Sequence, residues 1–180
     1  IWDYFNLSKG CVFLDVGAHV GKYVIPIART LGKNGLVIAV EPCPENYKTL
    51  VENIRLNGLE NVIPLNIAAW DKDCKLKMFY GNKSGAHSIK KNFGLGSLTV
   101  QAQALDHVLT ELKVKEVSCI KIDVEGAELE VLKGLKKTLE RYHPIVLVET
   151  WKSTDVRNFI AQLGYRMVKV APAFFVCKHS

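Results

Sequence analysis

Hydrophobic and polar positions divide this chain into two alternating kinds of segment. Short, nearly unbroken apolar runs occupy 11–16, 36–40, 62–67, 118–123 and 144–148. Such runs are typical of parallel strands, which are covered on both faces. Between them apolar residues recur every three or four positions, the spacing of one face of a helix. The pattern therefore predicts parallel strands connected by helices.

The helical spacing predicts helices over about 21–31, from Pro42 and Pro44 to Asn57, and over 105–112, 127–139 and 156–163. Strict alternation predicts two further strand pairs, 75–80 with 97–103 and 165–170 with 173–178. The first pair is an inserted hairpin whose 81–96 connection is long enough to act as a lid. We expect one α/β domain over 1–180, a doubly wound sheet with helices on both faces that ends in an antiparallel pair.

Composition narrows the function classes. The 180 residues carry a net charge of +6, but the lysines are dispersed and suit solvated faces better than a nucleic-acid footprint. Five cysteines are scattered without metal-type spacing, which favours a reduced, cytoplasmic protein. No apolar run approaches the length of a membrane span, and the first residues lack a signal-peptide pattern.

The stretch Val12–Tyr23 predicts a ligand site at the carboxyl end of the first strand. Gly17 and Gly21 bracket a tight turn that leads into a helix N-terminus. Ala18 and His19 stand where a dinucleotide fingerprint has a second glycine, which argues against a pyrophosphate. Asp15 is expected either to accept backbone N–H bonds from the turn or to face a ligand ammonium group. S-adenosylmethionine, with an adenosine, a sulfonium and an amino-acid end, matches these needs.

Carboxylates end four of the predicted parallel strands: Asp15, Glu41, Asp123 and Glu149. Each is costly to bury without a partner, so packing alone explains them poorly. Glu41 lies 20 residues beyond Gly21, where a carboxylate accepts two hydrogen bonds from a ribose diol in dinucleotide-binding folds. The alternative for Glu41 is a helix-cap acid before Pro42.

Five blocks of the chain resemble the FkbM family of S-adenosylmethionine-dependent methyltransferases. In order they are VFLDVGAHVG, AVEPCPENYKTLVENIRLNG, NIAAWD, IKIDVEGAELEVLKG and PIVLVE, and they span Val12 to Glu149. The resemblance implies the class I methyltransferase fold, a Rossmann-like, mostly parallel seven-stranded sheet whose last pair is antiparallel. It also implies transfer of a methyl group, with acceptors that include hydroxyls of sugars, glycans and secondary metabolites.

The resemblance also implies roles for individual residues. Gly17, Ala18 and Gly21 would line the cofactor, Glu41 would hold its ribose, and Ala68 and Ala69 would lie near its adenine. His19 departs from the family, which usually has Asn there, so its role in the cofactor site is unassigned.

Methyl transfer to a hydroxyl needs an aligned acceptor and often a base. Our candidates for that base are Asp123, Glu125 and His87, in that order. Lys121 lies two residues before Asp123 on a buried strand and needs a partner, for which Glu149 is the candidate. Asp123 and Glu149 alone do not define a metal site, and we predict none.

Three readings of the chain remain open. The favoured one is an O-methyltransferase acting on a small-molecule or glycan hydroxyl. An RNA methyltransferase is possible but less favoured, because the net charge supports it only weakly. The third is a nicotinamide-dependent oxidoreductase or a non-catalytic nucleotide-binding module, against which the missing middle glycine argues.

Overall fold

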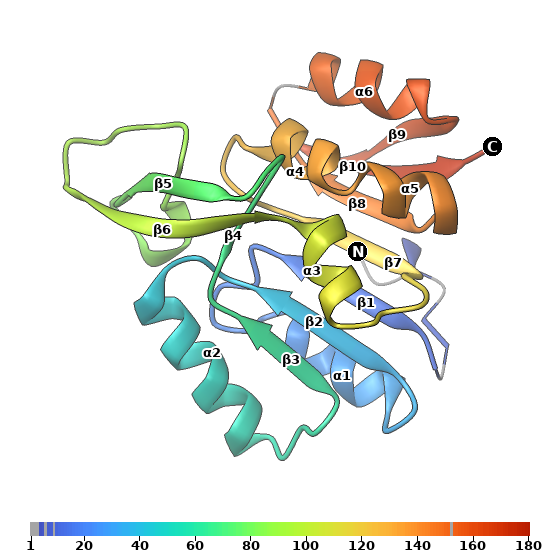
Figure 1. The fold of residues 1–180 in the computed structure, drawn as a ribbon, viewed down its shortest axis with the longest axis horizontal. Coiled ribbons are helices and arrows are strands. Elements are labelled where there is room, and N and C mark those ends of the chain that lie inside the picture. The colour runs from blue at the N-terminus through green and yellow to red at the C-terminus, as the bar shows by residue number, and fades with distance from the viewer. Residues whose placement is uncertain (1–3, 6, 9, 152) are drawn as a thin grey trace.

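A computed structural model describes residues 4–5, 7–8, 10–151 and 153–180, and it contains two sheets (Figure 1). The main sheet has seven strands in the order β3-β2-β1-β7-β8-β10-β9. Its strands are β1 (Val12–Val16), β2 (Leu36–Val40), β3 (Val62–Leu65), β7 (Cys119–Ile122), β8 (Ile145–Glu149), β9 (Tyr165–Ala171) and β10 (Phe174–His179). The first five run parallel, and β10 lies antiparallel between β8 and β9. The predicted doubly wound sheet with an antiparallel C-terminal pair is confirmed.

Helices cover both faces of this sheet, because side chains alternate along each strand. Phe13, Val37 and Ala39 pack on the face of α1 (Val24–Leu31) and α2 (Pro44–Leu56). Leu14 and Ile38 pack on the opposite face. That face is covered by α3 (Leu105–Glu111), α4 (Glu128–Gly134), α5 (Lys136–Tyr142) and α6 (Ser153–Gln162).

The inserted element is a three-stranded sheet rather than the predicted hairpin. It has the order β4-β6-β5, where β4 is Ala68–Trp70, β5 is Cys74–Phe79 and β6 is Ser97–Ala104. β5 and β6 form the predicted antiparallel pair, and β4 adds in parallel to β6. The strand predicted over 62–67 therefore ends early. Asn66 donates to the carbonyls of Glu41 and Pro42, at the point where the chain leaves the main sheet.

The helix predicted over 127–139 is wrong as a single element, because it divides into α4 and α5 at Leu135. Asp106 supplies the physical reason. Its carboxylate accepts the N–H groups of Lys137 and Thr138, at 2.8 and 2.9 Å, and so caps a new helix from another part of the chain.

None of the five cysteines, all of which lie within the described residues, forms a disulfide bond. Within the described ranges, no helix is both long enough and apolar enough to cross a membrane.

Candidate functional site

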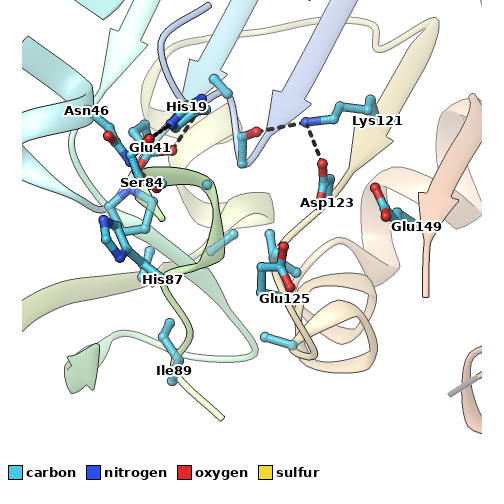
Figure 2. Close-up of a pocket in the computed structure, with 18 of the residues that line it drawn as sticks. His19, Glu41, Asn46, Ser84, His87, Ile89, Lys121, Asp123, Glu125 and Glu149 are labelled. Atoms are coloured by element: carbon cyan, nitrogen blue, oxygen red, sulfur yellow. Dashed lines mark hydrogen bonds and ion pairs between the residues drawn. The ribbon is translucent and has the colours of Figure 1, made fainter. Parts of the chain in front are cut away.

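A cleft of about 230 Å³ lies beyond the carboxyl ends of the parallel strands (Figure 2). Ligands of doubly wound sheets bind at this edge. Nine of the predicted site residues line the cleft: Gly17, Ala18, His19, Glu41, Ala68, Ala69, His87, Asp123 and Glu125. The other two, Asp15 and Gly21, lie behind it, as described below.

The glycine turn after β1 is anchored to the end of β2. The N–H groups of Gly17 and Ala18 both donate to the carbonyl of Val40, at 3.0 Å each. The N–H of His19 donates to Oε2 of Glu41 at 2.9 Å. These three amides are thus already bonded within the protein. Asp15 accepts none of them, so the expectation that its carboxylate holds the turn is wrong.

Gly17 is required by the approach of two backbones. Its φ is +79°, and a Cβ there would lie 1.8 Å from the carbonyl oxygen of Asp123. Gly21 has φ +96° and packs towards Leu50 rather than towards the cleft. Both glycines therefore shape the turn, and only Gly17 also faces the cleft.

Glu41 is buried, and its carboxylate joins three segments. Oε2 accepts the N–H of His19, while Oε1 accepts the N–H of Cys43 at 2.9 Å and faces the amide of Asn46 at 3.4 Å. Cys43 is the N-cap of α2, so Glu41 does bind the backbone at the start of this helix, as the alternative interpretation expected. Burial raises the pKa of Glu41, and the backbone donors partly oppose that rise. Because each carboxylate oxygen has two lone pairs, Glu41 also keeps acceptor capacity towards the cleft that it lines.

Small and apolar side chains form one wall of the cleft beside Glu41. They come from the segment before α2, from β4 and β5, and from the 81–96 loop: Pro42, Ala68, Ala69, Met78 and Ile89. A narrow apolar slot next to a buried carboxylate suits a planar ring joined to a polar sugar. Met78 and Ile89 are contributed by the inserted segment, which is why apolar spacing alone did not place them in the site.

Lys121 is a buried cation that connects the turn to the strand ends. Its Nζ donates to the carbonyl of Gly17 at 2.7 Å and lies 3.0 Å from Oδ1 of Asp15 and 3.8 Å from Oδ2 of Asp123. Burial by itself lowers the pKa of Lys121, but these carboxylates outweigh burial and raise it.

The expected pairing of Lys121 with Glu149 is wrong, and strand register explains why. Lys121 is opposite Asp15 on β1 and opposite Leu147 on β8. Asp15 is fully buried in that ion pair and lies behind the cleft, which it does not line. Its carboxylate therefore faces an ammonium group of the protein instead of one on a ligand.

Glu149 meets Asp123 instead. Ile122 is opposite Val148, and continuing this register by one residue places the two carboxyl groups side by side (Figure 2). Burial, followed by the charges of Asp123 and Glu125, raises the pKa of Glu149 to about 7. Burial and the Asp123 charge also raise the pKa of Glu125. Once Glu149 has lost its proton, its carboxylate can accept one from a hydroxyl group.

The 81–96 loop lies over the cleft and is anchored to both of its sides. On one side His19 Nε2 lies 3.0 Å from Oγ of Ser84, and Asn46 donates to the Ser84 carbonyl at 2.9 Å. On the other side Ser88 donates to the carbonyl of Glu125 at 2.7 Å. His87 lines the cleft, and its Nδ1 accepts the N–H of Gly81 at 3.0 Å. In a neutral His87 ring the proton is then on Nε2.

Sequence reasoning missed several polar residues of the site, among them Asn46 and Ser84. Asn46 shares the buried stripe of α2 with Leu50 and Ile54, so a polar residue on an apolar face was the available signal. Ser84 belongs to a short 3₁₀ turn, η2 (Ser84–Ala86), in a stretch without periodicity. Among the residues that the structure describes, no group of three or more His, Cys, Asp or Glu side chains has an arrangement suited to a metal ion.

Comparisons with known proteins identify the family. The Methyltransferase FkbM domain matches residues 15–167. The chain is 28% identical to methyltransferase sdnD of Sordaria araneosa, over 90% of this chain and 74% of sdnD. It is 30% identical to the hexuronic acid methyltransferase AglP of Haloferax volcanii, over 82% of this chain and 59% of AglP.

Solved structures share the fold. A methyltransferase FkbM from Methylobacillus flagellatus superposes with a TM-score of 0.70 at 16% identity, covering 95% of this chain and 44% of that one. A SAM-dependent methyltransferase from Aquifex aeolicus gives a TM-score of 0.59 at 17% identity, covering 98% of this chain and 86% of that one. This chain thus spans less than half of the FkbM structure and about three fifths of AglP. With the domain match covering most of its length, the chain belongs to the FkbM family of S-adenosylmethionine-dependent methyltransferases.

Proposed function

We propose that this chain transfers a methyl group from S-adenosylmethionine to a hydroxyl oxygen of a sugar, glycan or secondary metabolite. The observation that carries the proposal is the arrangement of carboxylates along the cleft. Glu41 lies at one end, beside the apolar slot, and Asp123, Glu125 and Glu149 lie at the other.

The lining fits this cofactor. Glu41 would accept from the ribose hydroxyls, and Ala68, Ala69 and Met78 would pack against the adenine. Among the described residues of the lining, four carboxyl groups stand against two lysines, Lys22 and Lys121, so the lining favours a positively charged ligand. Ala18 and His19 would lie along the amino-acid end.

The bound cofactor supplies a methyl group on a positively charged sulfur, and the new C–O bond forms as the C–S bond breaks and sulfur keeps the electron pair. The chain's own part is to hold the acceptor hydroxyl in line and to take its proton. Asp123 and Glu149, which both line the cleft, would take this proton. Lys121 holds Asp123 from behind, and the anchored 81–96 loop would exclude water.

The acceptor class is supported by the relatives. AglP is named a hexuronic acid methyltransferase, which indicates that a domain of this family works on a sugar. The absence of an Asn/Asp-Pro-Pro-aromatic segment after β7, where this chain has Asp123 to Gly126, also favours oxygen over a nucleobase amine.

Isothermal titration with S-adenosylhomocysteine tests the cofactor assignment. We expect binding by the intact protein and a Kd about 30-fold higher in Glu41→Ala, because bonds between a carboxylate and hydroxyl groups are lost. Glu52→Ala is the matched control, since Glu52 is an exposed acid on α2, the helix that follows Glu41. No binding by the intact protein, or unchanged binding in Glu41→Ala, would contradict the assignment.

A further inference from the structure

A second hollow, of about 270 Å³, opens beside the cofactor cleft. It shares Asp123, Glu125 and Glu149 with that cleft. The three carboxyl groups therefore stand between the two spaces. A molecule in the second hollow would present its atoms to the same carboxyl groups that border the place of methyl transfer.

Trp151 forms the outer wall of this hollow and leaves 83% of its surface exposed. It follows Glu149, the last residue of β8, by two residues. An exposed tryptophan beside a polar hollow offers a flat apolar surface next to hydrogen-bonding groups. The C–H face of a pyranose ring packs on such a surface, while its hydroxyl groups point to the side.

The polar groups of the hollow are almost entirely acceptors. Glu128 is occupied within the protein, because it accepts the N–H of Gly126 at 2.7 Å and the hydroxyl of Thr150 at 3.3 Å. The backbone of Glu125 has the left-handed conformation, with φ +53°. The hydroxyl of Ser88 donates to its carbonyl oxygen. An ionised carboxylate accepts hydrogen bonds and donates none, so Glu125 and Glu149 suit the hydroxyl donors of a sugar.

The negative charge of the hollow favours acceptors that carry no negative charge of their own. Among the described residues that line it, Lys91 is the single basic one, against four acids: Asp123, Glu125, Glu128 and Glu149. A carboxylate or phosphate on the acceptor would meet like charges in a partly desolvated space, which costs free energy. An uncharged acceptor avoids this repulsion.

We propose that this second hollow is the acceptor subsite and that it takes a neutral saccharide, with a ring against Trp151 and hydroxyl groups on Glu125 and Glu149. The inference rests on the proposed function and sharpens it. It separates this chain from enzymes whose acceptor is a uronic acid, and it excludes RNA as the acceptor.

Matched pairs of acceptors test the charge selection. Labelled methyl transfer is measured to the methyl glycosides of glucose, galactose and mannose, to the corresponding uronic acids, and to polyuridylate. We expect kcat/KM to be about tenfold or more higher for a neutral sugar than for its uronic acid, from one unfavourable charge contact. Glu125→Gln should narrow that ratio, because it removes one of the repelling charges.

Variants of Trp151 test the stacking surface. Trp151→Ala should lower kcat/KM for the neutral sugar about tenfold, and Trp151→Tyr should keep most of it. Leu56→Ala is the control, because Leu56 is also exposed but lies at the end of α2, away from both spaces. S-adenosylhomocysteine affinity should be the same in all three variants as in the parent.

The outcomes distinguish the two proposals. A parent protein that does not bind S-adenosylhomocysteine removes the proposed function, and the acceptor subsite with it. Normal binding with equal transfer by Trp151→Ala and the parent overturns the subsite alone. Normal binding with a preference for uronic acids, transfer only to polyuridylate, or transfer to none of the neutral glycosides overturns it as well.

Discussion

At the scale of single residues, strand register decides which charged groups meet. Asp15 and Lys121 are opposite one another on β1 and β7 and form a buried ion pair. The next positions along the same face bring Asp123 beside Glu149, with no lysine directly between them. Asp15 is thus neutralised by a buried cation, while the charge of Asp123 contributes to the raised pKa of Glu149. A structural ion pair and a proton-accepting pair arise from the same alternation of side chains.

The raised pKa of Glu149 predicts a pH dependence of activity. Since this pKa is about 7, Glu149 loses its proton as the pH rises through that value. We expect kcat/KM for methyl transfer to rise with pH through about 7, and Glu149→Gln to move the inflection to lower pH. A pH–rate profile of both proteins measures this. Glu52→Gln, an exposed acid on α2, should leave the inflection in place.

The raised pKa of Glu149 also predicts that folding stability falls with rising pH, whereas activity rises. A carboxyl group whose folded-state pKa is raised stabilises the fold below its unfolded pKa, and that contribution is lost as the pH rises through about 7. Glu149→Gln should therefore have a higher Tm than the parent at pH 8 and a similar Tm at pH 5. Equal Tm values at pH 8 would show that ionised Glu149 carries no cost in the fold.

At the scale of elements, the 81–96 loop is held over the cleft by polar contacts. The His19 side chain reaches Ser84 at 3.0 Å, while the His19 N–H is bonded to Glu41. His19 thereby connects the glycine turn, the end of β2 and the loop. This gives a structural role to the one turn residue that motif comparison left unassigned. Burial of the ring and nearby Lys121 lower the pKa of His19, so its neutral form is favoured.

Replacing His19 with Asn should loosen the loop without unfolding the turn. His19 has φ +51°, a conformation that Asn tolerates well, and its N–H bond to Glu41 is a backbone bond that the variant keeps. We expect the free energy of unfolding to change by less than about 0.5 kcal/mol, while amide hydrogen exchange over 81–88 becomes faster. His107→Asn, on the exposed side of α3, is the control. Unchanged exchange over 81–88 in His19→Asn would mean that Asn46 and Ser88 alone hold the loop.

At the scale of the whole molecule, α4 packs against both sheets, and Gly134 allows its close approach to the small one. Gly134 ends α4, and a Cβ there would lie 1.9 Å from the carbonyl oxygen of Trp70 in β4 and 3.4 Å from Cα of Ala104 in β6. The small sheet carries Ala68, Ala69 and Met78 into the cleft. The contact of α4 with β4 therefore positions one wall of the site.

Gly134→Ala should destabilise the protein by about 2 kcal/mol, because backbone atoms on both sides must move to admit a methyl group. Urea unfolding measures the effect. Gly85→Ala is the matched control, since a Cβ at Gly85 meets nothing within 4 Å and its φ is ordinary. A Gly134→Ala variant as stable as Gly85→Ala would indicate that α4 and β4 can separate without cost.

The five parallel strands of the main sheet could be predicted from sequence because they read as continuous apolar runs, and β9 and β10 could be predicted from their alternating pattern. The exceptions have local causes. β4 is three residues long and pairs with β6, more than 30 positions away, so no local pattern marks it. The division of the 127–139 helix depends on a cap from Asp106, which is equally remote in sequence.

The parts of the candidate site that lie at strand ends could be predicted from sequence. The parts that depend on which side chains contact one another in the fold could not. Glu41, Asp123 and Glu125 line the cleft because strand ends converge there. Asp15 also lies near the end of a strand, but it forms an ion pair with Lys121 instead of lining the cleft. This pairing depends on the register between β1 and β7. Asn46 was hidden among the stripe residues of α2, which spacing alone assigns to the core.

The carbonyl of Val40 accepts the amides of both Gly17 and Ala18. This affects which adenosine compounds of the cell can compete for the cleft. Many adenosine compounds in a cell carry phosphate groups, and a phosphate at this turn would find these two amides, and that of His19, already engaged. It would also face the carboxylates of Glu41 and Asp123. An adenosine compound with a positive charge meets neither obstacle. By accepting both amides, the carbonyl of Val40 helps this domain discriminate against nucleotides that share the same base and sugar, without any bulky side chain to block them.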